Sequence, residues 1–422
     1  MGRIFFRRAN LIDGRNAPKK NATVVVEDER ITAVAANGDA PKPSAADVVY
    51  DLAGRSLMPG MVQCHYHAAY ADAEQLEDID LKHPATMLTL IAAKNAELLL
   101  RSGFTGAVSA GTLHNIDVTL KRAIDAGMIP GPRFVPCGQD IITTGDSVDV
   151  HPTWWKLQLE GGVLICDGPD EFRKAVRSEI KQGAEIIKVN PTGGHGLGSA
   201  DVMTMTIEEI NAAADTAHER GKKIRGHIVS KRGIIAALDA RFDLIDHCDR
   251  MDDECIERLV KQGTFVTPSL YFPYVTVEQY RRNRNPAMAG MDELERGLEH
   301  SYKMVPKAHA AGVKLVVGDD FGVAGLVHGD YAKELEAYVE GAGIPALDVI
   351  GWATRNGAEM LGMKDDLGTI EVGKLADLLV VNGDPVRDIA VLQDRANLDV
   401  IMKGGKFIEC QLTPGKAVAK SA

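Results

Sequence analysis

Short apolar runs that alternate with amphipathic segments of helical length are the feature that most constrains this chain. We count eight such runs, at residues 56–67, 104–111, 133–138, 185–190, 223–229, 243–248, 264–271 and 314–320. Residues 169–183, 206–221 and 251–263 are the clearest helical segments, and each closes on a glycine, the usual residue at a left-handed helix stop. Buried runs that alternate with helices predict a parallel sheet with helical crossovers.

Eight strand–helix units predict a closed (β/α)₈ barrel of the TIM type. The alternative is an open, doubly wound sheet, which would need a Gly-rich phosphate loop after its first strand, and the sequence has none there. The chain has 422 residues. Since such barrels take about 250 residues, a second, smaller domain fits as well. The expected fold class is therefore α/β.

The two ends of the chain have a different pattern from the middle. Residues 3–14, 22–36 and 47–54 are short strand-like runs separated by Gly, Asn and Asp, and residues 376–385 and 398–410 resemble them. We therefore predict that residues 1–56 and 363–422 together form one small β-sandwich domain. The barrel would then occupy residues 57–362.

Composition narrows the class of protein and its partners. The formal net charge is −11 and no basic run is visible, so nucleic acid and anionic membranes are poor partners. No apolar stretch reaches the roughly 20 residues of a membrane span, and the N-terminus does not read as a signal peptide. The six cysteines are scattered, which favours free thiols in a reducing compartment. We expect a cytoplasmic protein that acts on a small molecule.

Ionisable residues stand at the ends of five of the eight runs. They are His65 and His67, Lys188, His227, His247, and the pair Asp319 and Asp320. In a barrel, reactive residues lie at the carboxyl ends of the strands. Strand alternation places the imidazoles of His65 and His67 on one face. Imidazole and carboxylate ligands suit a divalent metal such as zinc, so these residues could hold one or two ions.

Each of these residues also has a structural explanation. A single His after an apolar run is more often structural than a ligand. Lys188 could extend from a strand end to water, and Asp319 or Asp320 could cap the next helix. Together, however, these explanations must account for five strand ends in a chain with only 12 histidines. The set therefore favours a metal site.

In these motifs the chain resembles the amidohydrolase superfamily, metal-dependent hydrolases with a (β/α)₈ barrel and a small β-sandwich. The similar segments are PGMVQCHYH, EIIKVNPTGG, IRGHIVS, LIDHCDR, VVGDDFG and GTIEVGKLADLLVVNGDP. They are spread over essentially the whole chain. The resemblance implies a site with two divalent metal ions, most often Zn²⁺. It also implies that the protein forms homo-oligomers.

The resemblance also implies a role for each ligand. His65 and His67 would bind the more buried ion, and His227 and His247 the second. Lys188, carboxylated by CO₂ to a carbamate, would bridge the two ions. Asp320, rather than Asp319, would contact the first ion and carry a proton from the metal-bridging hydroxide to the leaving group.

Two residues depart from the pattern of the superfamily. Gln63 stands where an Asp is frequent, and we expect its amide to orient a metal ligand in place of a carboxylate. Asp319 stands where Ser or Thr is common, which adds negative charge near the site.

Within the superfamily, the chain looks most similar to the branch of prolidases, Xaa-Arg/Lys carboxypeptidases and ochratoxin hydrolases. This implies cleavage of an amide bond in an N-acyl amino acid or a peptide-like substrate. Hydrolysis of a urea, carbamate, ester or lactone by the same site is the alternative. A non-catalytic assembly protein is disfavoured, because such a relative would be expected to lose ligands and this chain keeps the full set.

A substrate with a free carboxylate needs a cationic or hydroxyl partner, and an aromatic acyl group would suit an aromatic rim. Candidates in the loops at strand ends are His151, Trp154, Ser230, Lys231, Arg232, Tyr271 and His328. The structural alternative for each is an ordinary loop residue, solvated or packed against its own loop.

Overall fold

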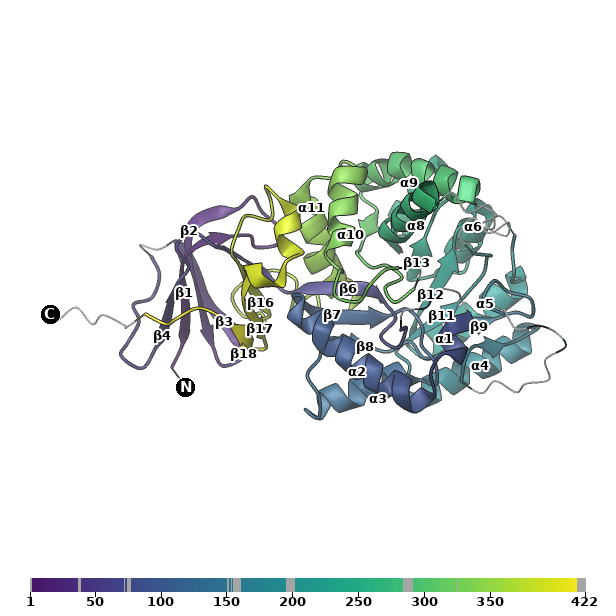
Figure 1. Ribbon diagram of the computed structural model, residues 1–422, viewed down its shortest axis with the longest axis horizontal. Coiled ribbons are helices and arrows are strands. Elements are labelled where there is room, and N and C mark those ends of the chain that lie inside the picture. Colours follow the sequence, from purple (N-terminus) through teal and green to yellow (C-terminus); the bar gives the residue numbers. More distant parts are fainter. Residues whose placement is uncertain are drawn as a thin grey trace. The chain divides into compact units, whose positions relative to one another are not determined.

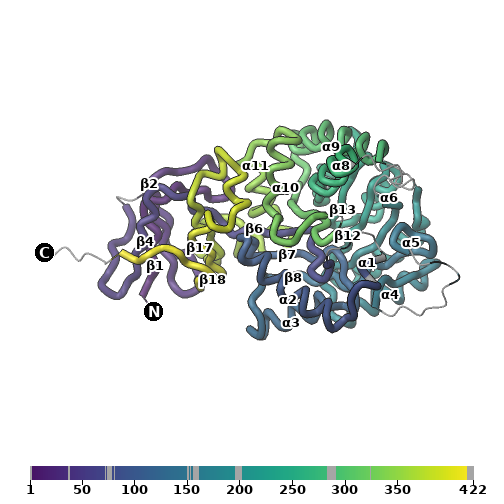
Figure 2. Tube along the Cα trace, viewed as in Figure 1, coloured from purple at the N-terminus to yellow at the C-terminus, as the bar shows by residue number. Residues whose placement is uncertain are grey.

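The computed structural model describes residues 2–36, 39–71, 73, 77–149, 152, 154, 161–194, 202–283, 291–323 and 325–415. The chain divides into two compact units. The terminal unit comprises Met1–Gln63, Leu99–Gly106 and Ile344–Ala422, and the central unit comprises Cys64–Leu98 and Ala107–Gly343. Figures 1 and 2 show the course of the chain in each unit.

Strands from both ends of the chain form one eight-stranded sheet in the terminal unit (Figure 1). Its order is β18-β17-β16-β5-β1-β2-β3, and β4 pairs with β1. The strands are β1 (Ile4–Leu11), β2 (Lys19–Glu27), β3 (Arg30–Ala36), β4 (Val48–Asp51), β5 (Ser56–Pro59), β16 (Leu378–Val381), β17 (Leu398–Lys403) and β18 (Lys406–Cys410). Strand β5 joins the two ends, because it pairs with both β1 and β16.

Alternate residues of these strands enter two separate apolar clusters. Phe6 and Val24 belong to a large cluster that also takes in Val380 and Val400 from the other end of the chain. Their neighbour Phe5 packs in a smaller cluster on the opposite side of the strand. The period of two along β1 therefore buries both faces of this strand.

The central unit is built on parallel strands. A seven-stranded sheet has the order β10-β9-β11-β12-β13-β14-β15, and a three-stranded sheet has the order β6-β7-β8. The strands are β6 (Met61–Tyr66), β7 (Phe104–Ser109), β8 (Arg133–Val135), β9 (Ile141–Ile142), β10 (Leu164–Ile165), β11 (Ile186–Val189), β12 (Lys223–Ile228), β13 (Leu244–His247), β14 (Phe265–Thr267) and β15 (Lys314–Leu315). All neighbours within the seven-stranded sheet pair parallel, which is the α/β arrangement predicted from the alternating pattern.

Each of the eight predicted apolar runs contains a strand, but the first run contains two. Residues 56–59 form β5 of the terminal sheet, and β6 begins after Gly60. A Cβ on Gly60 would lie 2.2 Å from the hydroxyl of Thr105, so the close approach of β7 leaves no room for a side chain here. The apolar pattern could not reveal this division, because all ten residues of β5 and β6 are buried.

Helices follow most of the central strands (Figure 1). They are α1 (Glu77–Leu81), α2 (Ala85–Arg101), α3 (Ile116–Asp125), α4 (Pro169–Gln182), α5 (Ile207–Glu219), α6 (Lys231–Asp239), α7 (Asp253–Gln262), α8 (Tyr271–Asn283), α9 (Met291–Ala311) and α10 (Lys333–Glu336). A π-helical turn, Ala337–Gly341, continues α10. In the terminal unit, α11 (Ala346–Gly351) and α12 (Gly357–Met360) are joined by the π-helical turn Trp352–Asn356.

The three helices expected from their pattern are present with the expected ends. Thr206 and Glu209 form a reciprocal capping box at the start of α5. Gly263 takes a left-handed conformation, with φ 70°, at the end of α7. Among the described residues, no helix combines the length and apolar character that a membrane crossing requires. All six cysteines are free thiols, as expected.

Candidate metal centre

The six predicted ligands lie at the carboxyl ends of central strands. His65 is in β6, Lys188 in β11 and His247 in β13. His227 is the fifth residue of β12, His67 follows β6 directly, and Asp320 lies in the loop after β15, five residues beyond Leu315. Parallel strands end at the same edge of a sheet, so the sequence pattern brings these side chains together.

Three of these residues form a compact triangle. The Nε2 atoms of His65 and His67 are 3.1 Å apart, and Asp320 Oδ1 lies 2.9 Å from the first and 3.4 Å from the second. Four ligands placed tetrahedrally about 2.0–2.1 Å from a zinc ion are about 3.3 Å from one another. The three atoms therefore have the spacing that one metal ion requires. Within the described residues, this is the group of His, Cys, Asp or Glu side chains that could hold an ion.

Hydrogen bonds on the far side of each ring leave the Nε2 atoms available to a metal. His67 Nδ1 is 3.0 Å from the carbonyl oxygen of Gly111, and His65 Nδ1 is 3.1 Å from Asp246 Oδ1. His67 Nδ1–H donates to the carbonyl, so the lone pair of this neutral ring is on Nε2. His65 has the same tautomer when its Nδ1–H donates to Asp246. A carbonyl or carboxylate behind the imidazole is the usual support of a metal-binding histidine.

The charge state of the triangle also suits a cation. Burial lowers the pKa of His67 to about 4, so its imidazole is neutral near pH 7. Burial acts to raise the pKa of Asp320, but the charge and hydrogen bond of His65 outweigh it and hold that pKa well below its usual range. A neutral His67 imidazole therefore stands beside the Asp320 carboxylate. The Asp320 side chain keeps 18% of its surface exposed, so the carboxylate is accessible.

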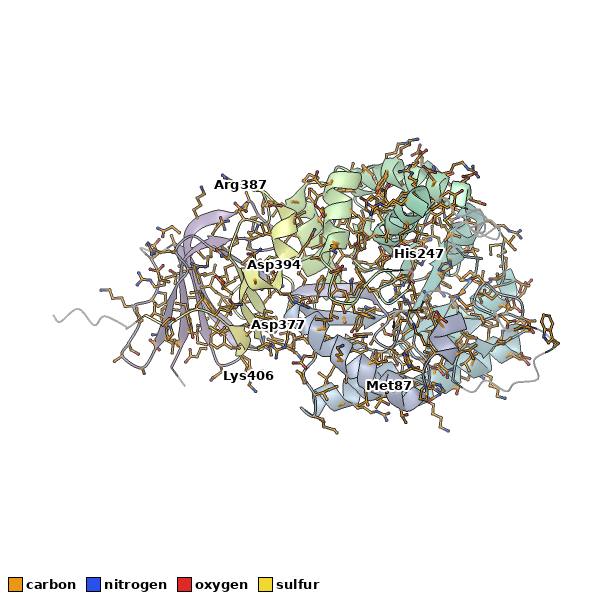
Figure 3. All side chains as sticks on the ribbon, in the orientation of Figure 1. Met87, His247, Asp377, Arg387, Asp394 and Lys406 are labelled. Carbon is orange, nitrogen blue, oxygen red and sulfur yellow. The ribbon has the colours of Figure 1, made fainter. Side chains whose placement is uncertain are left out.

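The other two candidate histidines, His247 and His227, lie next to this triangle. The ring centroids of His65 and His247 are 5.3 Å apart, and those of His247 and His227 are 4.5 Å apart. His247 stands at the end of β13 (Figure 3) in a left-handed conformation with φ 75°, which is uncommon for a residue other than glycine. Backbone strain of this kind occurs most often where function requires a particular side-chain direction.

Gly318 explains how β15 brings Asp320 next to β6. Its φ is 157°, and a Cβ there would lie 2.2 Å from the backbone nitrogen of His65. Only glycine permits this approach. The backbone N–H of Cys64 donates to the carbonyl of Val317 at 2.8 Å, which fixes the same pair of segments.

A buried ion network lies behind the histidines and was missed in the sequence. Asp246, which precedes His247, accepts hydrogen bonds from Lys188 Nζ at 3.0 Å and Arg225 Nε at 3.0 Å. Both Asp246 and Arg225 have no exposed surface. Because Arg225 stands two residues before His227, the sequence alone could have placed both side chains on one face of the strand. Its pairing with Asp246 could not be predicted, because it depends on the register between β12 and β13.

Gln63 lacks the orienting contact that was expected of it, and the carboxylate of Asp319 has a structural role. The amide of Gln63 is buried, with no hydrogen-bond partner for either polar atom among the described residues, so the expected orienting contact is absent. Asp246 orients His65 instead. Asp319 accepts the backbone N–H groups of Tyr271, Phe272 and Asp320, and it therefore caps the start of α8.

Two of the substrate candidates have structural partners. Ser230 caps α6 by accepting the N–H of Gly233 at 3.1 Å, and is buried. Lys231 forms ion pairs with Asp252 and Glu254, both at 2.7 Å, so its charge is already matched. These contacts argue against the predicted role of either residue as a carboxylate clamp.

The other substrate candidates lie at different places in the structure. His328 Nε2–H donates to the carbonyl of Tyr70 at 3.0 Å, and its Nδ1 lies 2.9 Å from the hydroxyl of Tyr331. Tyr271 begins α8, and its backbone N–H binds Asp319. Trp154 is 77% exposed. Arg232 borders a surface cavity together with Glu208 and residues 203–207. His151 lies outside the described residues.

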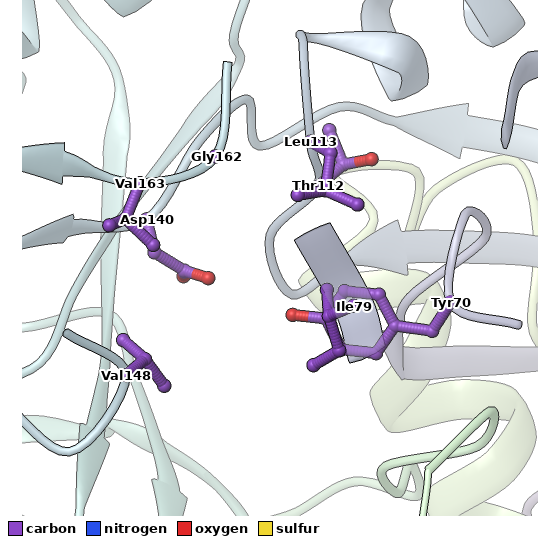
Figure 4. Close-up of a pocket in the computed structure, with 8 residues that line it drawn as sticks. All are labelled: Tyr70, Ile79, Thr112, Leu113, Asp140, Val148, Gly162 and Val163. Carbon is purple, nitrogen blue, oxygen red and sulfur yellow. The ribbon is translucent and has the colours of Figure 1, made fainter. Parts of the chain in front are cut away.

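A small pocket adjoins the triangle (Figure 4). The ring of Tyr70 stacks on that of His67, with centroids 4.1 Å apart, and forms one wall. The lining residues are Tyr70, Ile79, Thr112, Leu113, Asp140, Val148, Gly162 and Val163. Most are apolar, but the buried atoms Asp140 Oδ1 and Thr112 Oγ1 have no hydrogen-bond partner within the described structure. Burial raises the pKa of Asp140 to about 6.

Comparisons with a family profile, with sequences and with solved structures all point to amidohydrolases. The profile of the amidohydrolase family matches residues 56–408. Ochratoxinase from Aspergillus niger is 26% identical over 424 residues, covering 94% of this chain and 85% of that protein. A Xaa-Pro dipeptidase with bound methionine in its active site superposes with a TM-score of 0.85, at 29% identity, over 96% of this chain and 100% of the other.

A prolidase in complex with N-methylphosphonate-L-proline also superposes with a TM-score of 0.85, at 26% identity, over 97% of this chain and 100% of the other. The family profile spans every strand that carries a candidate ligand. This chain is therefore an enzyme of the amidohydrolase family.

Proposed function

We propose that this enzyme is a metal-dependent hydrolase that cleaves the amide bond of an N-acyl amino acid or a peptide-like substrate. The observation that carries the proposal is the triangle of His65, His67 and Asp320, whose three ligand atoms have metal-site spacing. Asp320 is the one member of the triangle with appreciable exposed surface. It can therefore face both an ion and a substrate.

The residues present fit a site for two divalent ions, and imidazole and carboxylate ligands of this kind suit Zn²⁺. His65, His67 and Asp320 would hold the first, and His227 and His247 the second. Lys188 would join the two sites once CO₂ has converted its amine to a carbamate. This conversion replaces a cation by an anion, which is the charge that a position between metal ions requires.

Bound ions would polarise the scissile carbonyl and lower the pKa of a water molecule, so that hydroxide is available to attack the carbonyl carbon. Asp320 would accept the proton of that water and pass it to the nitrogen of the leaving amine. The low pKa of its carboxyl group means that it begins the cycle ionised. Tyr70 and the apolar side chains beside it would exclude water from one side of the substrate.

The substrate class is inferred from the relatives and from the pocket. A dipeptidase, a prolidase with a proline phosphonate bound, and an ochratoxinase are among the similar proteins. The pocket beside His67 combines apolar walls with the acceptor atom Asp140 Oδ1. An apolar acyl or side-chain group that carries a hydrogen-bond donor would match this lining.

For the fold, we propose that the three-stranded and seven-stranded sheets close into one barrel within residues 57–362, apart from Leu57–Pro59, which belong to β5 of the terminal sheet. Supporting contacts are the hydrogen bonds from Cys64 to Val317 and from Glu185 to Pro136, at 2.8 and 2.9 Å. The strands in residues 1–56 and 363–422 would then form the β-sandwich, since one cluster of buried residues takes side chains from both ends.

A hydrolysis screen tests the proposed function. Zinc-loaded enzyme prepared with bicarbonate should hydrolyse members of a library of N-acyl amino acids and dipeptides, and should leave matched esters and phenylureas intact. Turnover of esters or ureas alone would overturn the assignment to amides.

Replacement of the bridging residue tests the metal arrangement behind that activity. Lys188→Ala should reduce zinc content and activity together, and added short carboxylic acids should restore part of both by occupying the place of the carbamate. Unchanged zinc content and activity in this variant would contradict the bridging role. Lys174→Ala, an exposed lysine of α4, is the matched control.

A further inference from the structure

We infer that Arg225 is a positioning residue of the metal centre, which holds Asp246 against His65 and Lys188 and offsets the negative charge that Lys188 acquires as a carbamate. The inference rests on the proposed function, because it concerns the lysine that is proposed to join the two ions. It begins from an unusual placement, a guanidinium with 0% exposure inside the central unit.

The contacts of Arg225 leave it little freedom. Its Nε and Nη2 atoms donate to the two oxygens of Asp246, at 3.0 and 2.5 Å. Its Nη1 atom donates to the carbonyl oxygens of Cys64 and Ser109, both at 2.8 Å. A two-point bond on one side and two carbonyls on the other fix the plane of the guanidinium, which a lysine in its place could not reproduce.

This fixed guanidinium reaches two metal ligands through Asp246, and its Nη2 atom also lies 3.2 Å from His65 Nδ1. The carboxylate accepts His65 Nδ1–H at 3.1 Å through Oδ1 and Lys188 Nζ at 3.0 Å through Oδ2. The first bond keeps the lone pair of His65 on Nε2, toward the ion. The second holds the lysine nitrogen in place. Strand register supports the arrangement, since Lys188 of β11 is directly opposite Arg225 of β12.

Stability alone does not account for the buried pair. Removing two charges from water is unfavourable, and apolar residues of similar volume often stabilise a fold equally well or better. Asp246 nevertheless bonds to Arg225, Lys188 and His65 inside the unit. The geometry therefore ties the buried pair to two of the candidate metal ligands.

The balance of charge changes when Lys188 reacts with CO₂. The ammonium loses a proton, the nitrogen lone pair bonds to the carbon of CO₂, one C=O electron pair moves to oxygen, and a second proton passes to solvent. Two cations and one anion thus become one cation and two anions. Without Arg225, the new carbamate would stand next to the unpaired carboxylate of Asp246, and two like charges at this distance repel strongly in a buried site.

Two substitutions, one that removes the cation and one that removes the anion, distinguish the proposed electrostatic role of Arg225 from a purely structural one. Arg225→Met removes the cation, so carbamate formation should need at least about tenfold more bicarbonate than in the wild type. Asp246→Asn removes the anion and keeps the shape, so carbamate should form at lower bicarbonate than in the wild type. Both variants should bind zinc about 10–100-fold more weakly, because His65 loses its oriented partner.

The measurement is a titration of metal-free enzyme with ¹³C-labelled bicarbonate, following the carbamate carbon by NMR, with zinc affinity measured in parallel. Thermal unfolding identifies variants that have not folded, and if Arg225→Met fails to fold, Asp246→Asn still tests the sign. Asp117→Asn is the matched control. This buried carboxylate accepts the backbone N–H groups of Cys137 and Gly138, and its loss should leave the bicarbonate requirement unchanged.

Wild-type bicarbonate dependence in folded Arg225→Met, or a higher requirement in Asp246→Asn, would overturn the inference and leave the proposed function intact. An equal fall in the bicarbonate requirement of Asp117→Asn would also overturn it, because the loss of any buried carboxylate would then have the same effect. No carbamate signal in the wild-type enzyme would overturn the proposed lysine ligand together with this inference.

Discussion

Two arginine–aspartate pairs, one in each unit, differ in how far they are exposed. In the terminal unit, Arg8 pairs with Asp51 at 2.6 Å, and both side chains keep about half of their surface, at 54% and 53%. In the central unit, Arg225 and Asp246 are both 0% exposed. Exposed pairs contribute little to stability, whereas buried pairs are expensive to desolvate. The buried Arg225–Asp246 pair therefore indicates function, and the exposed Arg8–Asp51 pair does not.

The largest effect should follow the loss of the proton carrier. Asp320→Asn keeps the shape of the ligand but cannot accept a proton, so kcat should fall about 10²–10⁴-fold while metal is retained. Steady-state kinetics with metal analysis on the same sample measures both. Asp319→Asn is the control, and it should lower the melting temperature by weakening the cap of α8. If the loss of kcat appears in Asp319→Asn and not in Asp320→Asn, the catalytic assignment is off by one residue.

The next effect concerns the buried pair. Arg225→Met leaves the carboxylate of Asp246 buried without its guanidinium, so the free energy of unfolding should fall by about 3–5 kcal/mol. Urea unfolding of the metal-free protein measures this. A loss below about 1 kcal/mol would mean that the pair resembles an exposed one, and the contrast between the two units would disappear.

The pocket carboxylate predicts a stabilising change with a defined pH dependence. Asp140 has a pKa of about 6 in the folded chain, above the ordinary value of 3.8. Because the folded state binds its proton more tightly than the unfolded state, stability falls as the pH rises from about 4 to about 6. In metal-free protein, Asp140→Asn should therefore add up to about 3 kcal/mol at pH 7 and nothing below about pH 4. Equal effects at both pH values would refute the raised pKa.

The smallest effect is expected in the terminal unit. Arg8→Met breaks a pair that is open to water, so the free energy of unfolding should change far less than in Arg225→Met, and less still in high salt. The same urea unfolding measurement applies. A loss as large as that of Arg225→Met would remove the basis for treating the two units differently.

The strands and part of the candidate site could be predicted from the sequence, because these features depend on local periodicity. The eight apolar runs, the alternation of His65 with His67, and the strand-end position of Lys188 follow from a period of two and from strand polarity. The comparisons confirm the family. The capping box at Thr206 and the glycine that ends α7 are local signals as well.

What the sequence could not show depends on neighbours across strands. Asp246 supports His65 although the two residues are 181 positions apart. Lys231 looked like a free cation until Asp252 and Glu254 were placed beside it. The cap that Asp319 provides belongs to a helix that begins 48 residues earlier. None of these pairings has a local signature.

The central claim is that six strand-end side chains hold two metal ions. Crystals of enzyme prepared with zinc and bicarbonate, measured at the zinc absorption edge, test it most directly. The predicted result is two anomalous peaks per chain, one between His65, His67 and Asp320 and one between His227 and His247, with density for a carbamate on Lys188 joining them. Zinc bound elsewhere, or no peak among these side chains, would contradict the account.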